Sequence, residues 1–171
     1  TWRKNVDGSY AGSLYTLPDR GYNVAGLIDY AARIQKFDLA FTPDYTTNTV
    51  GQTQLTLTFK GTTKITDFNG NATTAVNPTG TTLSGFTNVP TASVGGVTKF
   101  TVDGEGLAIR ADGSFYISDE YGASIYHVRK PGQMQGVITP VQALIPQFSN
   151  PAYTGFTTES AAIATGIQTG G

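Results

Sequence analysis

Apolar and polar residues alternate along several short segments of the chain, and such alternation predicts half-buried β-strands. The clearest example is residues 54–60, where Leu55, Leu57 and Phe59 alternate with threonine and lysine. The same reasoning predicts further strands at residues 12–17, 98–102, 114–118, 124–128 and 137–144.

The segment 27–41 fits two patterns. Its first half carries apolar residues at helical spacing, whereas Phe37, Leu39 and Phe41 alternate as in a strand. We expect a short helix or loop, followed by a strand at about 33–41. The composition favours strands throughout, because 21 Gly, 8 Pro, 9 Tyr and 9 Phe among 171 residues suit pleated sheet and tight turns. The sequence therefore predicts an all-β protein.

A stretch near the N-terminus recurs 101 residues later. Residues 12–21 align without gaps on residues 113–122, with matching Gly, Ser, Tyr and final Gly. A strand candidate follows each copy, so two related three-strand units are expected, as in repeat architectures. At about 40–50 residues per blade, the chain holds three to four blades of a β-propeller. A β-sandwich is the alternative.

Residues 68–98 carry no charged side chain and are rich in Asn, Thr, Gly, Pro and Ser. Such composition is typical of long connections between short strands. We expect a loop-rich insertion here, within a single propeller domain of which residues 1–171 form part.

Charge, cysteine and histidine content exclude several classes of function. A net charge of −1 leaves no basic field for nucleic acid or anionic lipid, and no apolar run of about 18 residues is present to span a membrane. The absence of cysteine excludes disulfides, thiolate catalysis and zinc–thiolate sites. The single histidine, His127, lies in a predicted strand, and we expect it to pack or to form a hydrogen bond there.

Only 13% of the residues are charged, which suits an extracellular protein. Residues 71–73 read Asn-Ala-Thr, the acceptor pattern for N-glycosylation. We therefore expect the protein to be secreted and glycosylated on Asn71.

Carboxylates gather around a hairpin predicted within residues 103–122. The Asp-Gly pair at 112–113 is a strong hairpin signal. A two-residue turn sets Glu105 opposite Glu120, and a three-residue turn sets it opposite Asp119. Because directly opposed like charges destabilise a sheet, a cation, a basic side chain or a raised carboxylate pKa must offset them.

Oxygen ligands without nearby thiols or imidazoles suit Ca²⁺ better than a transition metal. In a propeller, the repeat places Asp19 and Arg20 on the same face of the wheel as the hairpin end. We therefore expect a Ca²⁺ site formed by Glu105, Asp103, Asp119 and Asp19. Two alternatives remain open, namely a purely structural acidic rim and a pair of carboxylates that share one proton.

The same hairpin resembles the phytase-like esterase family, and more loosely the calcium-dependent six-bladed lactonases and phosphotriesterases. In the latter, a Glu that opens an inner strand ligates the metal, and Glu105 is the matching position. The resemblance implies hydrolysis of an ester or a phosphoester. It is carried by residues 103–108, 112–122 and 124–126, with support from 17–23 and 140–146.

These residues suggest a division of roles. The cation would polarise a carbonyl or phosphoryl oxygen, Asp119 or Glu120 would act as general base, and Arg20 would hold an anionic substrate oxygen. The chain lacks the basic cluster that phytate itself would require. The alternative function is a non-catalytic propeller that binds a protein or a glycan, with the acidic cluster as a structural cation site.

A partial wheel would expose unpaired strand edges and apolar blade faces. The chain begins at Thr1 without a methionine or a signal peptide, and it ends at Gly171. We therefore expect a second polypeptide from the same cleaved precursor to complete the propeller, with a second copy of this chain as the less favoured partner.

Overall fold

The computed structural model describes residues 2–20, 25–46, 54–122, 124–139, 141, 148–149 and 156–157. These residues form strands and turns and include no α-helix, so the all-β prediction is confirmed. The chain divides into two compact units. The first comprises residues 1–16 and 34–63, and the second comprises residues 17–33 and 64–171.

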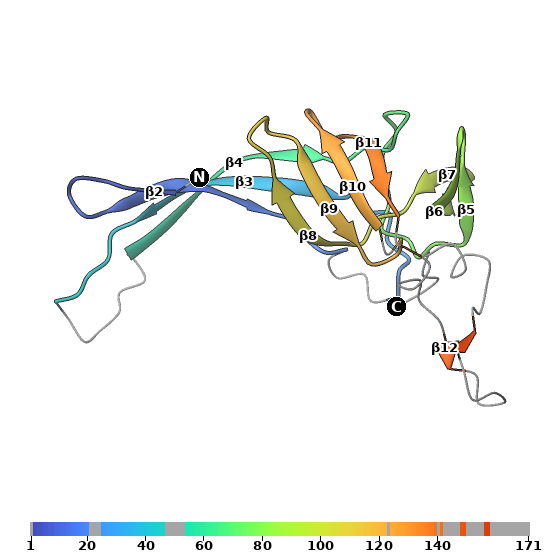
Figure 1. Cartoon of the computed structure of the whole chain (residues 1–171), viewed down its shortest axis with the longest axis horizontal. Helices are drawn as coiled ribbons and strands as arrows, with labels where there is room; N and C mark the ends of the chain where they lie inside the picture. The colour runs from blue at the N-terminus through green and yellow to red at the C-terminus, as the bar shows by residue number, and fades with distance from the viewer. Residues whose placement is uncertain are drawn as a thin grey trace. The chain divides into compact units, whose positions relative to one another are not determined.

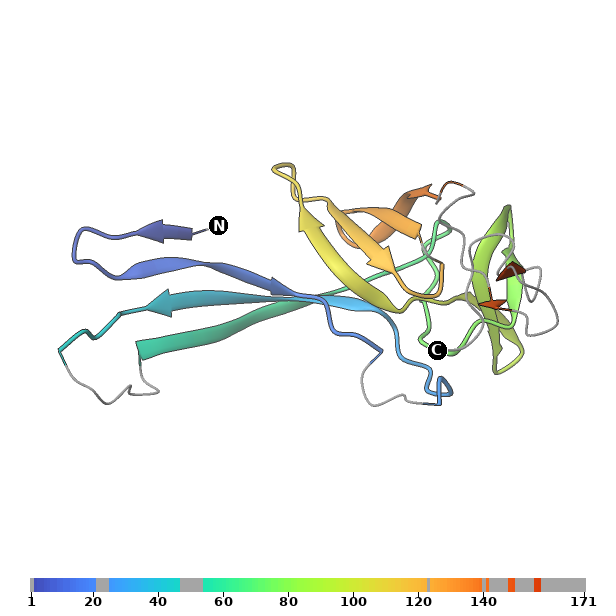
Figure 2. The same cartoon turned by 60° about the horizontal axis from the view of Figure 1, so that its bottom comes forward.

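The first unit is built on an antiparallel sheet in which each strand pairs with the next along the chain (Figures 1 and 2). Its four strands lie in the order β1-β2-β3-β4. They are β1 (Trp2–Lys4), β2 (Tyr10–Thr16), β3 (Arg33–Phe41) and β4 (Leu55–Lys64).

The two faces of this sheet differ in character. Tyr10 pairs with Phe41 and Leu14 pairs with Phe37, so these side chains share one face. Phe59 of β4 lies on the same face, because its ring centroid is 5.6 Å from that of Phe37. We call this side the apolar face of the first sheet. Its members are Trp2, Tyr10, Leu14, Phe37, Leu39, Phe41, Leu55, Leu57 and Phe59.

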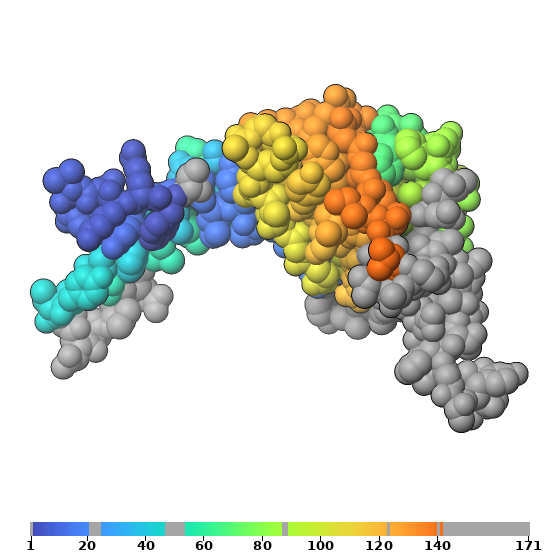
Figure 3. Space-filling view, in the orientation of Figure 1, coloured from blue at the N-terminus to red at the C-terminus, as the bar shows by residue number. Residues whose placement is uncertain are grey.

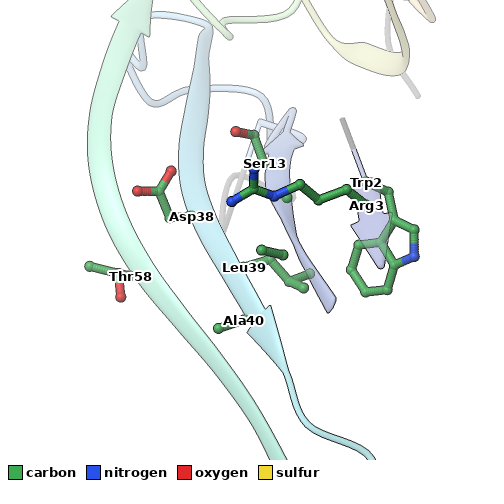
Figure 4. Close-up of a pocket in the computed structure, with 9 residues that line it drawn as sticks. Trp2, Arg3, Ser13, Asp38, Leu39, Ala40 and Thr58 are labelled. Carbon is green, nitrogen blue, oxygen red and sulfur yellow. The ribbon is translucent and has the colours of Figure 1, made fainter. Parts of the chain in front are cut away.

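The opposite side of the first sheet is polar. Asp38 and Lys60 form an ion pair there, with 3.3 Å between Oδ2 and Nζ. Small residues on β2 and β3 leave a groove of about 530 Å³ on this sheet. Arg3, Ser13 and Asp38 lie around it (Figure 4).

The second unit contains a second four-stranded antiparallel sheet and a three-stranded one (Figure 1). The order in the larger sheet is β11-β10-β9-β8, which leaves β8 at an edge, and Figure 3 shows β8, in yellow, at the surface. A short hairpin of β12 (Phe148–Ser149) and β13 (Phe156–Thr157) follows. The larger sheet comprises β8 (Gly104–Ile109), β9 (Phe115–Asp119), β10 (Ser124–Arg129) and β11 (Gln133–Ile138). The smaller comprises β5 (Gly80–Leu83), β6 (Phe86–Val94) and β7 (Val97–Phe100).

The core of the second unit lies between these two sheets. Phe100 of β7 meets Tyr126 of β10 edge to face, with 5.2 Å between ring centroids, and Phe68 packs against Phe100. Neither Phe100 nor Tyr126 is exposed to solvent by more than 1%. Burying such a side chain contributes roughly 1.5–3 kcal/mol, so these contacts stabilise the unit and hold the strand ends that carry the acidic residues.

Most predicted strands are present. Those predicted at 12–17, 33–41, 54–60, 98–102, 114–118 and 124–128 correspond to β2, β3, β4, β7, β9 and β10. The strand predicted at 137–144 begins earlier and ends at Ile138, and residues 140 and 142–144 lie outside the described part. Of the helix or loop expected before β3, the loop is present, because residues 25–32 form a turn, bends and irregular backbone.

The uncharged stretch 68–98 differs from the expectation of mainly loop structure. It contains β5 and β6 and the start of β7, joined by backbone pairing such as Thr91 with Phe100. Threonine has a high strand propensity because its branched side chain packs well on a pleated surface. The uncharged, threonine-rich stretch therefore forms part of a hydrogen-bonded sheet and not mainly loops.

The repeat is also present, but in a different register. Asp7 and Asp112 each accept hydrogen bonds from the backbone N–H and the hydroxyl of the serine two residues later. The glycine between has φ of 86° in the first turn and 78° in the second, a left-handed conformation that glycine tolerates.

These two turns lie 105 residues apart, so the alignment at 101 residues is wrong. It matched Gly12, which lies within β2, to the turn residue Gly113. In the correct register, the turns join β1 to β2 and β8 to β9, the first two strands of each four-stranded sheet. Open antiparallel meanders of this kind are compatible with propeller blades and with a sandwich.

Candidate functional site

Acidic side chains from separate segments of the second unit meet at one place. Asp19 follows β2 in the chain, Asp103 lies between β7 and β8, and Glu105 lies in β8. One carboxylate oxygen from each lies within 4.8 Å of the others. Asp103 is buried, with 1% of its surface exposed, whereas Asp19 and Glu105 are exposed. We call these residues the acidic trio.

A β-bulge places Glu105 in this group. Gly106 pairs with Ser118, as a three-residue turn requires, but Gly104 then pairs with Asp119, so Glu105 is an extra residue with no partner in the β8–β9 ladder. Both predicted registers are therefore wrong at Glu105.

The backbone at Gly104, next to the bulge, closely approaches the Leu17 side chain. A Cβ atom at this position would lie 2.9 Å from Cδ2 of Leu17, which is closer than real contacts allow. The Asp103 backbone N–H donates to Asp119 Oδ1 over 2.6 Å, and the Glu120 N–H donates to the Asp103 carbonyl over 2.9 Å. These bonds hold the strand start at the position where the trio forms.

Asp103 is the most unusual member of the trio. Its Oδ2 lies 3.2 Å from Nε of Arg20. Its Oδ1 is buried and accepts no hydrogen bond from the part of the chain that the structure describes. Burial and the neighbouring Asp19 carboxyl raise the pKa of Asp103 to about 7, against the opposing effect of Arg20. Because an unsatisfied buried carboxylate oxygen is costly, Oδ1 marks a position for a ligand or a proton.

Arg20 is held by three protein groups. Besides the Asp103 carboxylate, its Nη1 donates to the Tyr121 hydroxyl over 2.7 Å and to Asn77 Oδ1 over 3.2 Å. The Tyr121 hydroxyl in turn lies 2.8 Å from Asn77 Oδ1. The guanidinium thus holds Oδ2 of Asp103 in a fixed orientation. Sequence reasoning found Arg20 but assigned no role to Asn77 or to Tyr121, although Tyr121 lies within the stretch 112–122 that carries the family resemblance.

Negative charge accumulates around the exposed side of the site. Although Glu105 is exposed, the surrounding protein removes part of the water around its carboxylate, and this desolvation, together with the charges of Asp19 and Glu120, raises the pKa of Glu105. The predicted cross-strand pairing of Glu105 is not formed, because the bulge leaves it out of the ladder, but Glu120 is among the groups that raise the pKa of Glu105. Such like charges attract a cation to the site.

Asp119 has a different environment. Its Oδ1 accepts from the Asp103 N–H, and its Oδ2 accepts from the Gly122 N–H over 2.7 Å and from the Tyr126 hydroxyl over 2.9 Å. Burial raises the pKa of Asp119 to about 7 despite these bonds. Both oxygens face protein donors, and the structure does not place Asp119 in the acidic trio.

The remaining sequence candidates lie outside this site. His127 stacks on Tyr116 with 5.0 Å between ring centroids, which agrees with the expected packing role. Asn71 is exposed, as an acceptor for a glycan must be. Thr73 of the same acceptor pattern is fully buried, where its hydroxyl donates to the Ile65 carbonyl and accepts from the Ala32 N–H.

Comparison with known proteins places this geometry in context. The family model of phytase-like proteins, described as esterase-like activity of phytase, matches residues 6–168. An uncharacterized secreted protein of Arthroderma benhamiae is 33% identical over 161 residues. That alignment covers 86% of this chain but 31% of the relative, so the chain spans about a third of the relative's length. No solved structure shows a significant match. Within the described residues, no helix is long and apolar enough to cross a membrane.

Proposed function

The chain belongs to the phytase-like family, and on this premise we propose that it forms part of a secreted hydrolase of esters or phosphoesters. Secretion is supported by the relative in Arthroderma benhamiae, which is named as a secreted protein, and by the low charge content of 13%. The reaction is assigned to the acidic trio and its neighbours, because these groups combine a cation-binding arrangement with a further carboxylate.

The observation that carries the proposal is the unsatisfied Oδ1 of Asp103 beside the carboxylates of Asp19 and Glu105. A hard divalent cation would satisfy this oxygen and offset the like charges. The donors are all carboxylate oxygens, which suits Ca²⁺, and His127 is stacked on Tyr116 and belongs to no metal-binding group in the described residues. We therefore assign Ca²⁺ to the acidic trio.

When bound, Ca²⁺ supplies a Lewis acid that polarises a carbonyl or phosphoryl oxygen. The protein residues provide the rest. Arg20 holds Oδ2 of Asp103, which leaves Oδ1 for the site. Asp119 fixes the backbone at Asp103. Glu120 is the remaining carboxylate near Glu105, and we assign it the role of general base toward the attacking water.

A substrate panel tests this function in the complete protein, because the chain spans only 31% of its relative. A phosphomonoester, a phosphodiester, a carboxyl ester and a lactone are assayed with Ca²⁺ and with a chelator. We expect at least one class to be turned over with Ca²⁺ and not with the chelator. In Glu120→Gln, we expect the turnover rate with Ca²⁺ to fall by about 100-fold or more. Asp112→Asn, at the far end of the same hairpin, is the control. Failure of folded protein to turn over any class contradicts the proposal.

A second function is favoured by the environment of Arg20. Its guanidinium already contacts Asp103, Tyr121 and Asn77, so it is poorly placed to hold a substrate anion. The second function is therefore non-catalytic: the protein binds another protein or a glycan, and the cation serves only to stabilise the fold. Ca²⁺ would then raise the melting temperature without supporting hydrolysis, and Glu105→Gln would abolish that rise while ligand binding on a glycan array persists.

A further inference from the structure

Five of the nine side chains on the apolar face of the first sheet are exposed, and the other four are half-buried. Trp2 and Phe59 each retain 56% of their accessible surface, and Leu57 retains 46%. The rings form a ladder across the strands, with centroids 5.3 Å apart for Trp2 and Tyr10 and 6.0 Å apart for Tyr10 and Phe41. Contiguous exposed apolar surface of this kind marks a contact site.

The contrast between the two faces supports this reading. The other face carries the ion pair of Asp38 and Lys60, and the Lys36 ammonium lies over the Tyr15 ring. Lys4 pairs with Tyr10 on the apolar face, but it lies in the edge strand β1. An antiparallel sheet with one polar and one apolar face is typical of a sheet that is solvated on one side and covered on the other.

The second unit shows how a similar sheet is covered. Its four-stranded sheet begins with the same Asp-Gly-Ser turn and has the same meander order as the first sheet. One face of that sheet contacts the neighbouring three-stranded sheet through Tyr126 and Phe100, and Ile117, Val128 and Met134 are at most 1% exposed. In repeat architectures, each unit buries its apolar face only against a neighbouring unit.

We propose that the apolar face of the first sheet is the packing surface for another antiparallel β-sheet, supplied by the part of the complete protein beyond these 171 residues. The relative of which this chain covers 31% has enough additional length for several such sheets. Two β-sheets stack face to face at a distance of about 10 Å, with their apolar side chains interleaved. The nine apolar side chains of this face are suited to such a contact.

Site-specific photo-crosslinking in the complete protein tests this assignment. p-Benzoylphenylalanine replaces Phe59 in one variant and Thr58, on the polar face, in the control. After irradiation, peptide mass spectrometry identifies the cross-linked segments. We expect the probe at position 59 to link to a strand outside residues 1–171, and the probe at position 58 to give no such link.

Three outcomes would overturn the proposal. The cross-links from position 59 would map to the second unit of this chain, or to a second copy in a mixture of isotopically distinct protein, or they would not form at all. A stability measurement gives an independent readout. We expect Phe59→Ser to lower the melting temperature of the complete protein by about 5–10 °C, and Thr58→Ser to lower it by less than about 2 °C. Equal shifts would also refute it.

Discussion

Replacement of Asp119 by asparagine is expected to destabilise the protein strongly, both with calcium and with a chelator. The carboxylate accepts from the Asp103 N–H, the Gly122 N–H and the Tyr126 hydroxyl, all within 2.9 Å. Asparagine keeps the volume and one acceptor oxygen, but its amide group turns two N–H donors toward a position that needs an acceptor.

The magnitude follows from the number of donors that lose their acceptor. An unsatisfied buried donor costs about 1–3 kcal/mol, so Asp119→Asn is expected to cost roughly 2–4 kcal/mol at pH 8, where the wild-type carboxylate is ionised. Tyr126→Phe removes one of the three bonds and is expected to cost about 1.5–3 kcal/mol. These are large fractions of the stability of a domain, which is typically about 5–15 kcal/mol.

The pH dependence of stability gives a second signature. Burial raises the pKa of Asp119 to about 7 in the folded state from an ordinary value of 3.8. The native state therefore binds a proton that the unfolded state releases, and this stabilisation is complete below 3.8 and is lost as the pH rises through about 7. The full contribution is at most about 4 kcal/mol. Asp119→Asn removes it.

Urea denaturation at pH 5 and pH 8, with chelator present, measures both effects. Asp112→Asn is the matched control, because Asp112 is exposed and its partners, Ser114 and Arg110, lie within or next to the same turn. We expect the control to cost less than about 1 kcal/mol. If Asp119→Asn were no more destabilising than Asp112→Asn, or if it abolished stabilisation by calcium while leaving chelator stability unchanged, the structural role of Asp119 would be refuted.

Further predictions concern Thr73, Gly104 and Asn71. Thr73→Val leaves a buried N–H and a buried carbonyl without their partner and is expected to cost about 2–4 kcal/mol in urea denaturation; a cost below about 0.5 kcal/mol would contradict the hydrogen-bond assignment. Gly104→Ala pushes a methyl group into Leu17 and is expected to weaken stabilisation by calcium in thermal melts, and unchanged melts would show that the bulge tolerates a side chain. Asn71→Gln is expected to remove a glycan from the secreted protein, as intact-mass measurement will show; an identical carbohydrate mass would rule out this acceptor.

Much of the fold was predictable because strand signals are local. In β3 and β4, apolar residues alternate with polar ones because the sheet has one apolar and one polar face. In β9, every second residue is buried. Both patterns can be seen in the strand's own sequence without reference to distant residues. β5 and β6 were missed because threonine, serine and small residues on both sides leave no alternation to detect. The predicted register of the repeat was wrong because the dipeptide Gly-Ser occurs both at 12–13, inside β2, and at 113–114, in the turn before β9.

The site was predictable only in part, because sequence patterns report local structure and not contacts between distant segments. The hairpin that carries Glu105 and Glu120 forms within one short segment, so its turn could be predicted. The bulge, in contrast, has no local sequence signal, and the contact of Leu17 with Gly104 beside it joins residues that are distant in sequence. Likewise, the donors that surround Asp119 and the contacts of Arg20 with Asn77 arise from tertiary packing, which single-sequence patterns do not encode.

Calorimetric titration of Ca²⁺ into the complete protein at pH 8 tests the central claim most directly, because Asp103, with a pKa of about 7, is then ionised. Wild-type protein and Asp112→Asn are expected to bind with a dissociation constant of about 1 mM or tighter, as extracellular calcium sites do. Glu105→Gln is expected to bind at least about tenfold more weakly, since it loses one of the three carboxylates. Absence of binding to the wild-type protein, or equal affinity in Glu105→Gln, would contradict the assignment of a calcium site to Asp19, Asp103 and Glu105.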